Sequence, residues 1–270
     1  MSSLVSKARY IAPYEFIINR SIEEWDIEKA NISVLRDTNF FTEEQYEQYR
    51  AMDKKQREVA IGYLIKENPH VYKVISSGIQ EAREIFFKKY NLEDEDILYI
   101  DNDSLTVIKR YKDTRKDPIQ IAKHTKFRLK NTYTSFYKIF FIDLLYFNNN
   151  IEEHYRLKNV NQEFIESRHS NFFLDLILSI AYSAQSDILS TLQFINEMYK
   201  KYCNKELDPG FYREFNSTNK YKINISNFSL YYADTISSLH DVDISFNASI
   251  LRLFYKILLK DYYMKLRGRK

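Results

Sequence analysis

The apolar positions near the start of the chain change from strand-like to helical spacing. Residues 10–19 are rich in β-branched and aromatic side chains and predict a strand, in which Pro13 favours an edge position or a bulge. After Asp26, apolar residues recur at intervals of three and four, as on one face of a helix. Asp26 stands where an N-cap would stand. The pattern therefore predicts that a strand or loop passes into a helix at Asp26.

Capping signals mark the helices that follow. Thr42 and Gln45 have the spacing of a capping box, and Asp53 precedes a second helix that Asn68-Pro69 ends. A third helix covers residues 71–90. Its predicted buried side consists of Val71, Val74, Ile75, Ile79, Ala82, Ile85 and Phe86.

The apolar runs change again at residues 97–109, which read ILYIDNDSLTVIK. Two short β-branched runs flank four polar residues, which predicts a tight hairpin. Strand-like composition continues through 127–147 and 152–160. From about residue 171 the spacing is helical, with segments at 172–202 and 248–266. We expect an α+β domain over residues 1–165 and a mainly helical region over 166–270.

Composition narrows the class of protein. The chain is 44% hydrophobic and 16% aromatic, enough for a core, and its net charge is only +3. The single cysteine, Cys203, excludes an internal disulfide framework and a multi-cysteine zinc site. The four glycines fit neither GxGxxG nor GxxxxGK[ST], which excludes phosphate-binding loops of the Rossmann and P-loop kinds. Neither a signal-peptide pattern nor an apolar run of about 18 residues occurs, so we expect a soluble cytoplasmic protein without a membrane partner.

Positive charge is concentrated in one segment. Residues 109–130 contain nine Lys or Arg residues against Asp113 and Asp117, a pattern suited to a nucleic-acid backbone. The tyrosines that follow could pack against sugars or bases, although strand tyrosines also form core or cross-strand pairs. The candidate nucleic-acid contacts are Lys123, Lys126, Arg128, Lys130, Tyr133 and Tyr137.

Three segments, in this order, resemble the palm motifs of family B DNA polymerases. The first, WDIEKANISVL, is similar to D-x-x-S-L-Y-P-S-I, with matches at Asp26, Ser33 and Val34. Ala30 and Asn31 stand where that family has Leu-Tyr.

The second segment, KKQREVAIGYL, is similar to K-x-x-x-N-S-x-Y-G at Lys54 and Gly62 but lacks Asn-Ser-x-Tyr. The third, YIDNDSLTV, is similar to Y-G-D-T-D-S-I-F-V at Asp101 and Asp103. KNTYTSFYKI and RLKNV are faintly similar to the lysine-rich region with which that family contacts the primer duplex.

The resemblance implies a palm-like antiparallel sheet with a helical thumb-like region, and phosphoryl transfer assisted by two metal ions. Asp26 and Asp103 would bind Mg²⁺ or Mn²⁺, and Asp101 would support them. Lys54, with Arg57 one turn along, would bind the triphosphate of a nucleotide.

Each motif has a simpler interpretation. Asp26 by itself fits an N-cap, the Asp-Asn-Asp-Ser stretch fits a turn, and Lys54 fits a solvated helix. About thirty residues separate Asp26 from Lys54, far fewer than a fingers domain occupies, so we expect a reduced palm with minimal fingers helices.

Two functions remain open. The first is nucleotidyl transfer or nucleic-acid binding in viral or phage replication, with DNA, a nucleoside triphosphate and replication or virion proteins as partners. The alternative is a non-catalytic viral or phage interaction or structural protein, with or without the palm fold. Both are consistent with the compact form of the chain and with an amino-acid composition typical of an AT-rich genome. For both we expect a location in the cytoplasm of a host cell.

Overall fold

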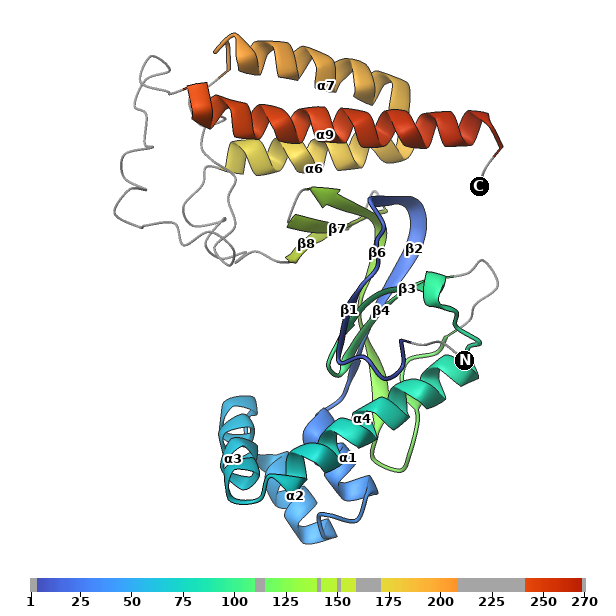
Figure 1. Ribbon diagram of the computed structural model, residues 1–270, viewed down its shortest axis with the longest axis vertical. Coiled ribbons are helices and arrows are strands. Elements are labelled where there is room, and N and C mark those ends of the chain that lie inside the picture. Colours follow the sequence, from blue (N-terminus) through green and yellow to red (C-terminus); the bar gives the residue numbers. More distant parts are fainter. Residues whose placement is uncertain are drawn as a thin grey trace. The chain divides into compact units, whose positions relative to one another are not determined.

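A computed structural model shows an α+β protein with an antiparallel sheet, which confirms the α+β class and the antiparallel pairing, while the palm-like identity of the sheet stays a prediction (Figure 1). The chain divides into two compact units, residues 1–13 with 21–132, and residues 14–20 with 133–270. We call them unit 1 and unit 2. The predicted domain boundary near residue 165 and part of the basic segment, at 110–114, lie outside the described residues. The structure describes residues 4–109, 115–139, 142–149, 152–158, 171–207 and 241–268.

Unit 1 contains strands in the order β1-β3-β4-β2-β6, with β5 paired to β6. The hairpin predicted at 97–109 is confirmed as β3 and β4, which pair antiparallel. Two of the strands, β2 and β6, extend beyond unit 1 into unit 2. The bounds are β1 Arg9–Ile11, β2 Phe16–Ile27, β3 Ile97–Asp101, β4 Ser104–Ile108, β5 Ile119–Gln120 and β6 Lys126–Ile139.

Two helices of unit 1 begin where the capping signals predict. The side chain of Thr42 accepts from the backbone N–H of Gln45 at 3.2 Å, and Asp53 accepts from that of Gln56 at 2.9 Å. Both are complete capping boxes, so both predictions are confirmed. The helices are α1 Ala30–Asp37, α2 Glu43–Ala51, α3 Lys54–Glu67 and α4 His70–Lys89, followed by a short 3₁₀ helix at Asp94–Asp96.

The expectation that Asp26 caps a helix is wrong. Pairing with β4 extends β2 to Ile27, so Asp26 is a strand residue. The first helix begins at Ala30, and the N-cap position belongs to Lys29, whose φ is 50° and whose side chain makes no capping hydrogen bond. Cross-strand hydrogen bonds thus override the local capping preference of Asp26.

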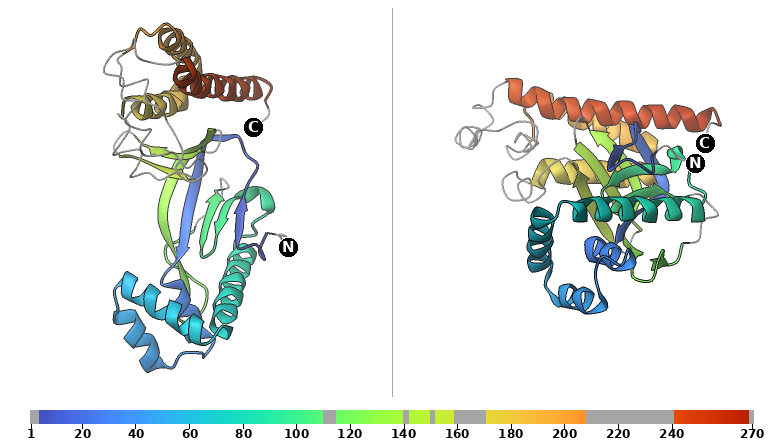
Figure 2. Two further views of the ribbon diagram at one scale, coloured as in Figure 1. Left: turned by 60° about the vertical axis from the view of Figure 1, so that its left-hand side comes forward. Right: turned by 60° about the horizontal axis from the view of Figure 1, so that its bottom comes forward.

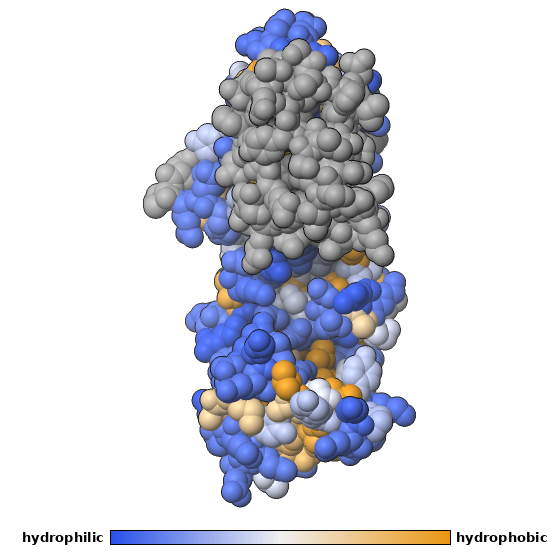
Figure 3. All heavy atoms as spheres, turned by 90° about the vertical axis from the view of Figure 1, so that its left-hand side faces the viewer, coloured by the Kyte–Doolittle hydropathy of each residue, from blue (hydrophilic) through white to orange (hydrophobic). Residues whose placement is uncertain are grey.

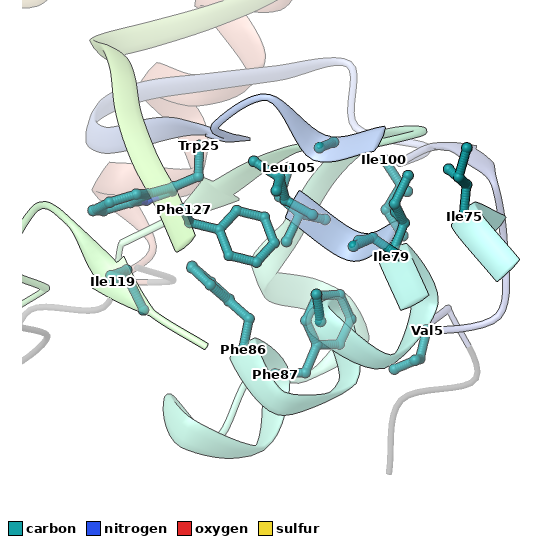
Figure 4. Packing of buried hydrophobic residues seen from close by; sticks show 14 of the residues in the cluster. Val5, Trp25, Ile75, Ile79, Phe86, Phe87, Ile100, Leu105, Ile119 and Phe127 are labelled. Atoms are coloured by element: carbon teal, nitrogen blue, oxygen red, sulfur yellow. The ribbon is translucent and has the colours of Figure 1, made fainter. Parts of the chain in front are cut away.

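The core of unit 1 forms between α4 and the strands. Figure 4 shows Phe86 of α4 pointing toward Trp25 and Phe127, while Phe87 lies on the side of Ile79 and Val5. The Phe86 ring lies 4.7 Å from that of Phe127 and 6.0 Å from that of Trp25, centroid to centroid. The predicted buried side of α4 is confirmed except at Val74, which is partly buried, and at Ile85, which is 37% exposed at the edge of that face.

Unit 2 combines strands with three described helices (Figure 2). Its strand order is β2-β6-β7-β8. The continuous helix expected at 172–202 is instead two helices, because Asp187 interrupts it and accepts from the backbone N–H of Ser190 as an N-cap. The further elements are β7 Ile142–Asn148, β8 Glu153–Lys158, α6 Asn171–Ser186, α7 Ile188–Cys203 and α9 Asp241–Leu266.

Helices α1 and α4 approach closely at Gly78. A Cβ added at Gly78 would fall well inside van der Waals contact of the Val34 side chain on α1. Gly62, in the middle of α3, has open space where a Cβ would be. The two glycines therefore differ in kind, since only Gly78 is required by packing.

We predict opposite stability changes for alanine at these glycines. Gly78→Ala should lower the free energy of unfolding by about 1–3 kcal/mol, because the buried and stiff Val34 must move. Gly62→Ala should raise it by about 0.5–1 kcal/mol through helix propensity. Urea unfolding of both variants measures these changes, and equal effects at the two sites would contradict the assigned close approach.

Candidate active site

The ends of β2 and the β3–β4 hairpin bring two predicted site residues together. Asp26 lies opposite Ser104 in the register of β2 and β4. The backbone N–H of Ile27 donates to the carbonyl of Asp103 at 3.1 Å. Asn102 adopts a left-handed φ of 52° in the turn, which asparagine tolerates better than most residues. Asp26 and Asp103 are therefore neighbours across the strand pair although they are distant in sequence.

The electrostatic setting of these carboxylates disfavours their charged forms. Burial raises the pKa of Asp103, and the negative charges of Asp26 and Asp101 raise it further. Burial also raises the pKa of Asp26, with a smaller contribution from Glu24, while Lys130 and Lys54 oppose the rise. Two partly buried carboxylates with raised pKa values form an environment that a cation would stabilise.

Lys130, predicted to contact nucleic acid, lies beside the carboxylate pair. Its Nζ is 3.7 Å from Oδ2 of Asp26, and both side chains are partly exposed. The sequence contains no signal for this contact, because it depends on β6 lying next to β2. Lys130 thus supplies part of the positive charge that the pair requires.

The nucleotide-binding candidates lie at the start of α3. Lys54 is its first residue, and the positive charge of Lys54 lowers the pKa of Asp26. Its Nζ also lies 3.8 Å from Oε1 of Glu58, at an exposed position. Arg57 is one turn along, where its Nη1 donates to the carbonyl of Met52 at 3.1 Å. Of the two, Lys54 is the residue whose charge reaches the carboxylates.

Asp101 lies at the end of β3 and is well exposed. Its Oδ1 is 3.4 Å from Nε of Arg9 on β1. The negative charge of Asp101 still raises the pKa of Asp103, so Asp101 contributes to the electrostatic field at the carboxylate pair although its own side chain is exposed.

The remaining predicted nucleic-acid contacts fall into two groups. Lys126 and Arg128 bind Oε2 of Glu28 at 3.0 and 3.1 Å, while Lys123 is exposed. The candidate tyrosines, Tyr133 and Tyr137, are both buried in unit 2, where Tyr137 packs against another aromatic ring. In this conformation neither tyrosine presents a ring face to a base.

The donor set fits a hard divalent cation that retains water. Among the described residues, no group of three or more His, Cys, Asp or Glu side chains is placed to hold a metal ion. Asp26 and Asp103 supply carboxylate oxygens, the ligands that Mg²⁺ prefers, and Mg²⁺ commonly binds through one or two carboxylates together with water and phosphate. The residues are therefore compatible with Mg²⁺ or Mn²⁺ but with few protein ligands.

The raised pKa of Asp103 predicts a pH-dependent effect of Asp103→Asn. Its ionisation costs folded stability as pH rises from the unfolded value of about 3.9 through the raised native pKa, and the cost remains above it. Asp103→Asn should therefore be more stable than wild type at neutral pH, with the difference vanishing in acid. Urea unfolding across pH measures this. Glu44→Gln, at an exposed position, is the control, and a difference independent of pH would contradict the prediction.

Divalent cations should stabilise the folded chain through the same pair. Saturation at a hundred times Kd adds about 2.7 kcal/mol to the free energy of unfolding. Thermal unfolding with Mg²⁺ or Mn²⁺ should show this in wild type and not in the Asp26→Asn, Asp103→Asn variant. Lys130→Gln should tighten cation binding, up to about fivefold, because it removes a competing charge at a partly exposed pair. Equal shifts in all three proteins would place the cation elsewhere.

Comparison with known proteins identifies a phage family. Residues 1–260 match the family described as Bacteriophage PBS1 gene 130 protein, which confirms the expected phage association. No curated protein matches the chain. Among the described residues, no helix is both long and apolar enough to cross a membrane. Because the match spans nearly the whole chain, this protein belongs to the bacteriophage PBS1 gene 130 protein family.

Proposed function

We propose that the chain catalyses metal-dependent nucleotidyl transfer on nucleic acid, through a reduced site resembling the palm of family B DNA polymerases. The proposal is carried by one observation, the juxtaposition of Asp26 and Asp103 with raised pKa values. Titratable groups perturbed by burial and by each other are concentrated at functional sites.

Each residue has a distinct part in this proposal. Asp26 and Asp103 bind Mg²⁺ or Mn²⁺, and Asp101 adds negative charge beside them. When bound, the cations stabilise the charge on the attacking and leaving oxygens of phosphoryl transfer. Lys54 orients and neutralises the triphosphate of a nucleoside triphosphate, since its ammonium group already acts on Asp26. Arg57 is a secondary candidate that would first have to leave the Met52 carbonyl.

Lys130 holds Asp26 before the substrate arrives. An ammonium group 3.7 Å from the carboxylate limits its repulsion from Asp103 and keeps it near its binding position. The substrates in this proposal are DNA and a nucleoside triphosphate, and the setting is phage replication in the host cytoplasm with other replication or virion proteins.

A second candidate function is non-catalytic. Lys130 already neutralises part of the charge on Asp26, and the described residues offer no third acidic ligand. A phage interaction or structural protein that keeps this fold without turnover would have the same contacts. The two functions differ in whether the carboxylates are needed for chemistry.

Primer extension tests the proposal. Wild type should extend a labelled primer with Mg²⁺ or Mn²⁺ and four nucleotides, and the Asp26→Asn, Asp103→Asn variant should lose at least about a hundredfold in rate. The loss follows from removing the groups that hold the cations. Gel analysis of extended primer gives the rates, and fluorescence anisotropy gives the affinity for the same substrate.

A charge-matched control separates chemistry from net charge. Glu44→Gln with Glu81→Gln removes two carboxylates from exposed helix positions and should extend like wild type. Binding without extension in wild type would favour the non-catalytic function. Extension that survives in the aspartate variant would assign the chemistry to other residues.

A further inference from the structure

We infer that the corner between α3 and α4 binds single-stranded nucleic acid, with Tyr63 and Tyr72 as stacking rings and three lysines as phosphate contacts. The inference adds a substrate class to the proposed function and rests on it for its role as a template path. The lysines are Lys66 and Lys73 at the corner and Lys55 at the other end of α3.

The two tyrosines are unusually exposed for aromatic side chains of unit 1. Tyr63 is 63% exposed and Tyr72 is 62% exposed, whereas Tyr46 and Tyr99 are buried. Tyr63 lies in the last two turns of α3, and Tyr72 lies in the first turn of α4. Only Asn68 and Pro69 separate the helices, so both rings belong to the same corner of the chain.

One face of α3 is left uncovered by the described chain. Lys55, Val59, Tyr63 and Lys66 follow one another at spacings of four, four and three, which places them along one side of a helix. All four are exposed, and Ile61 is the single buried residue of α3. Figure 3 shows the side of the molecule that carries α3, where apolar side chains reach the surface among hydrophilic ones.

The three lysines of this surface are not paired with carboxylates of the described chain. Across the described residues, no carboxylate lies within ion-pair distance of Lys55, Lys66 or Lys73, although exposed Glu67 flanks the face. Lys126 and Lys130 of β6, in contrast, already contact the carboxylates of Glu28 and Asp26. Unneutralised cations near nucleic acid release counterions on binding, and paired cations must first break an ion pair.

Exposed rings beside free lysines match single strands better than duplexes. Every unpaired base has a face that can stack on tyrosine, and such stacking contributes about fivefold or more in affinity per base. In a duplex the base faces are already stacked, so only the lysines would contribute. The chemistry therefore predicts a preference for single strands with little dependence on sequence.

The experiment compares ring, hydroxyl and charge in the full-length chain. Fluorescence anisotropy with labelled oligo-dT, oligo-U and a duplex of equal length gives the affinities. Tyr63→Ala with Tyr72→Ala should weaken single-strand binding by at least about fivefold, while Tyr63→Phe with Tyr72→Phe should bind like wild type. Both variants change only the exposed side chains at positions 63 and 72, and both are checked for unchanged thermal unfolding.

A second arm tests the charge. Lys66→Gln with Lys73→Gln should flatten the salt dependence of oligo-dT binding by about 1.4 in slope, because single strands contribute about 0.7 per contact. Lys88→Gln with Lys89→Gln removes the same charge from the far end of α4 and should leave the slope unchanged. Oligo-dT and oligo-U distinguish DNA from RNA.

Several outcomes would overturn the inference. They are absence of oligonucleotide binding in wild type, wild-type affinity in the tyrosine-to-alanine variant, or equal losses in the alanine and phenylalanine variants. Binding of a protein, but not of an oligonucleotide, at the α3–α4 corner would also overturn the inference. If extension fails but tyrosine-dependent binding persists, the inference stands without the proposed chemistry. If extension requires Asp26 and Asp103 while both tyrosines are dispensable, the chemistry stands alone.

Discussion

The register of β2 against β4 decides which side of the sheet each residue near the hairpin faces. Trp25 lies opposite Leu105, and both belong to the core beneath α4. Asp26 lies opposite Ser104, one residue further along, and so points to the other side. A slip of one residue would exchange these positions and place a carboxylate against Phe86. The pairing that fills the core is therefore the same pairing that brings Asp26 to Asp103.

Hydrophobic burial in unit 1 offsets the electrostatic cost of this arrangement. Trp25, Phe86 and Phe127 are fully buried and form edge-on aromatic contacts. Each fully buried side chain of this size contributes about 1.5–3 kcal/mol. Holding Asp26 and Asp103 together opposes folding, as their raised pKa values indicate. Lys130 reduces that cost without removing it, since the pair is partly exposed.

Positive charge is distributed differently from what its density in the sequence indicates. The cations of β6 lie beside Asp26 at the end of β2 and Glu28 directly after it, so much of their charge is neutralised by these neighbours. The lysines around the α3–α4 corner come from a less basic stretch of sequence but have no such neighbours among the described residues. Strand pairing thus determines which part of a basic sequence is available to an anionic partner.

Local patterns by themselves predicted the elements of unit 1 well. The capping boxes at Thr42 and Asp53, the buried side of α4 and the β3–β4 hairpin depend on neighbours within a few residues, which the sequence displays. Patterns also predicted the α+β class. They failed where tertiary contacts compete with local preference, as at Asp26, where cross-strand hydrogen bonds keep the residue in β2.

Only the tertiary structure decided the surroundings of the candidate site. The sequence nominated Asp26, Asp103 and Lys54, but their proximity depends on strand order and register, which no local spacing specifies. Lys130 beside Asp26 and the burial of Tyr133 and Tyr137 likewise follow from the place of β6 between β2 and β7. Residue chemistry is written in the sequence, whereas long-range pairing decides which groups meet and which remain exposed, because it depends on the free energy of the whole fold.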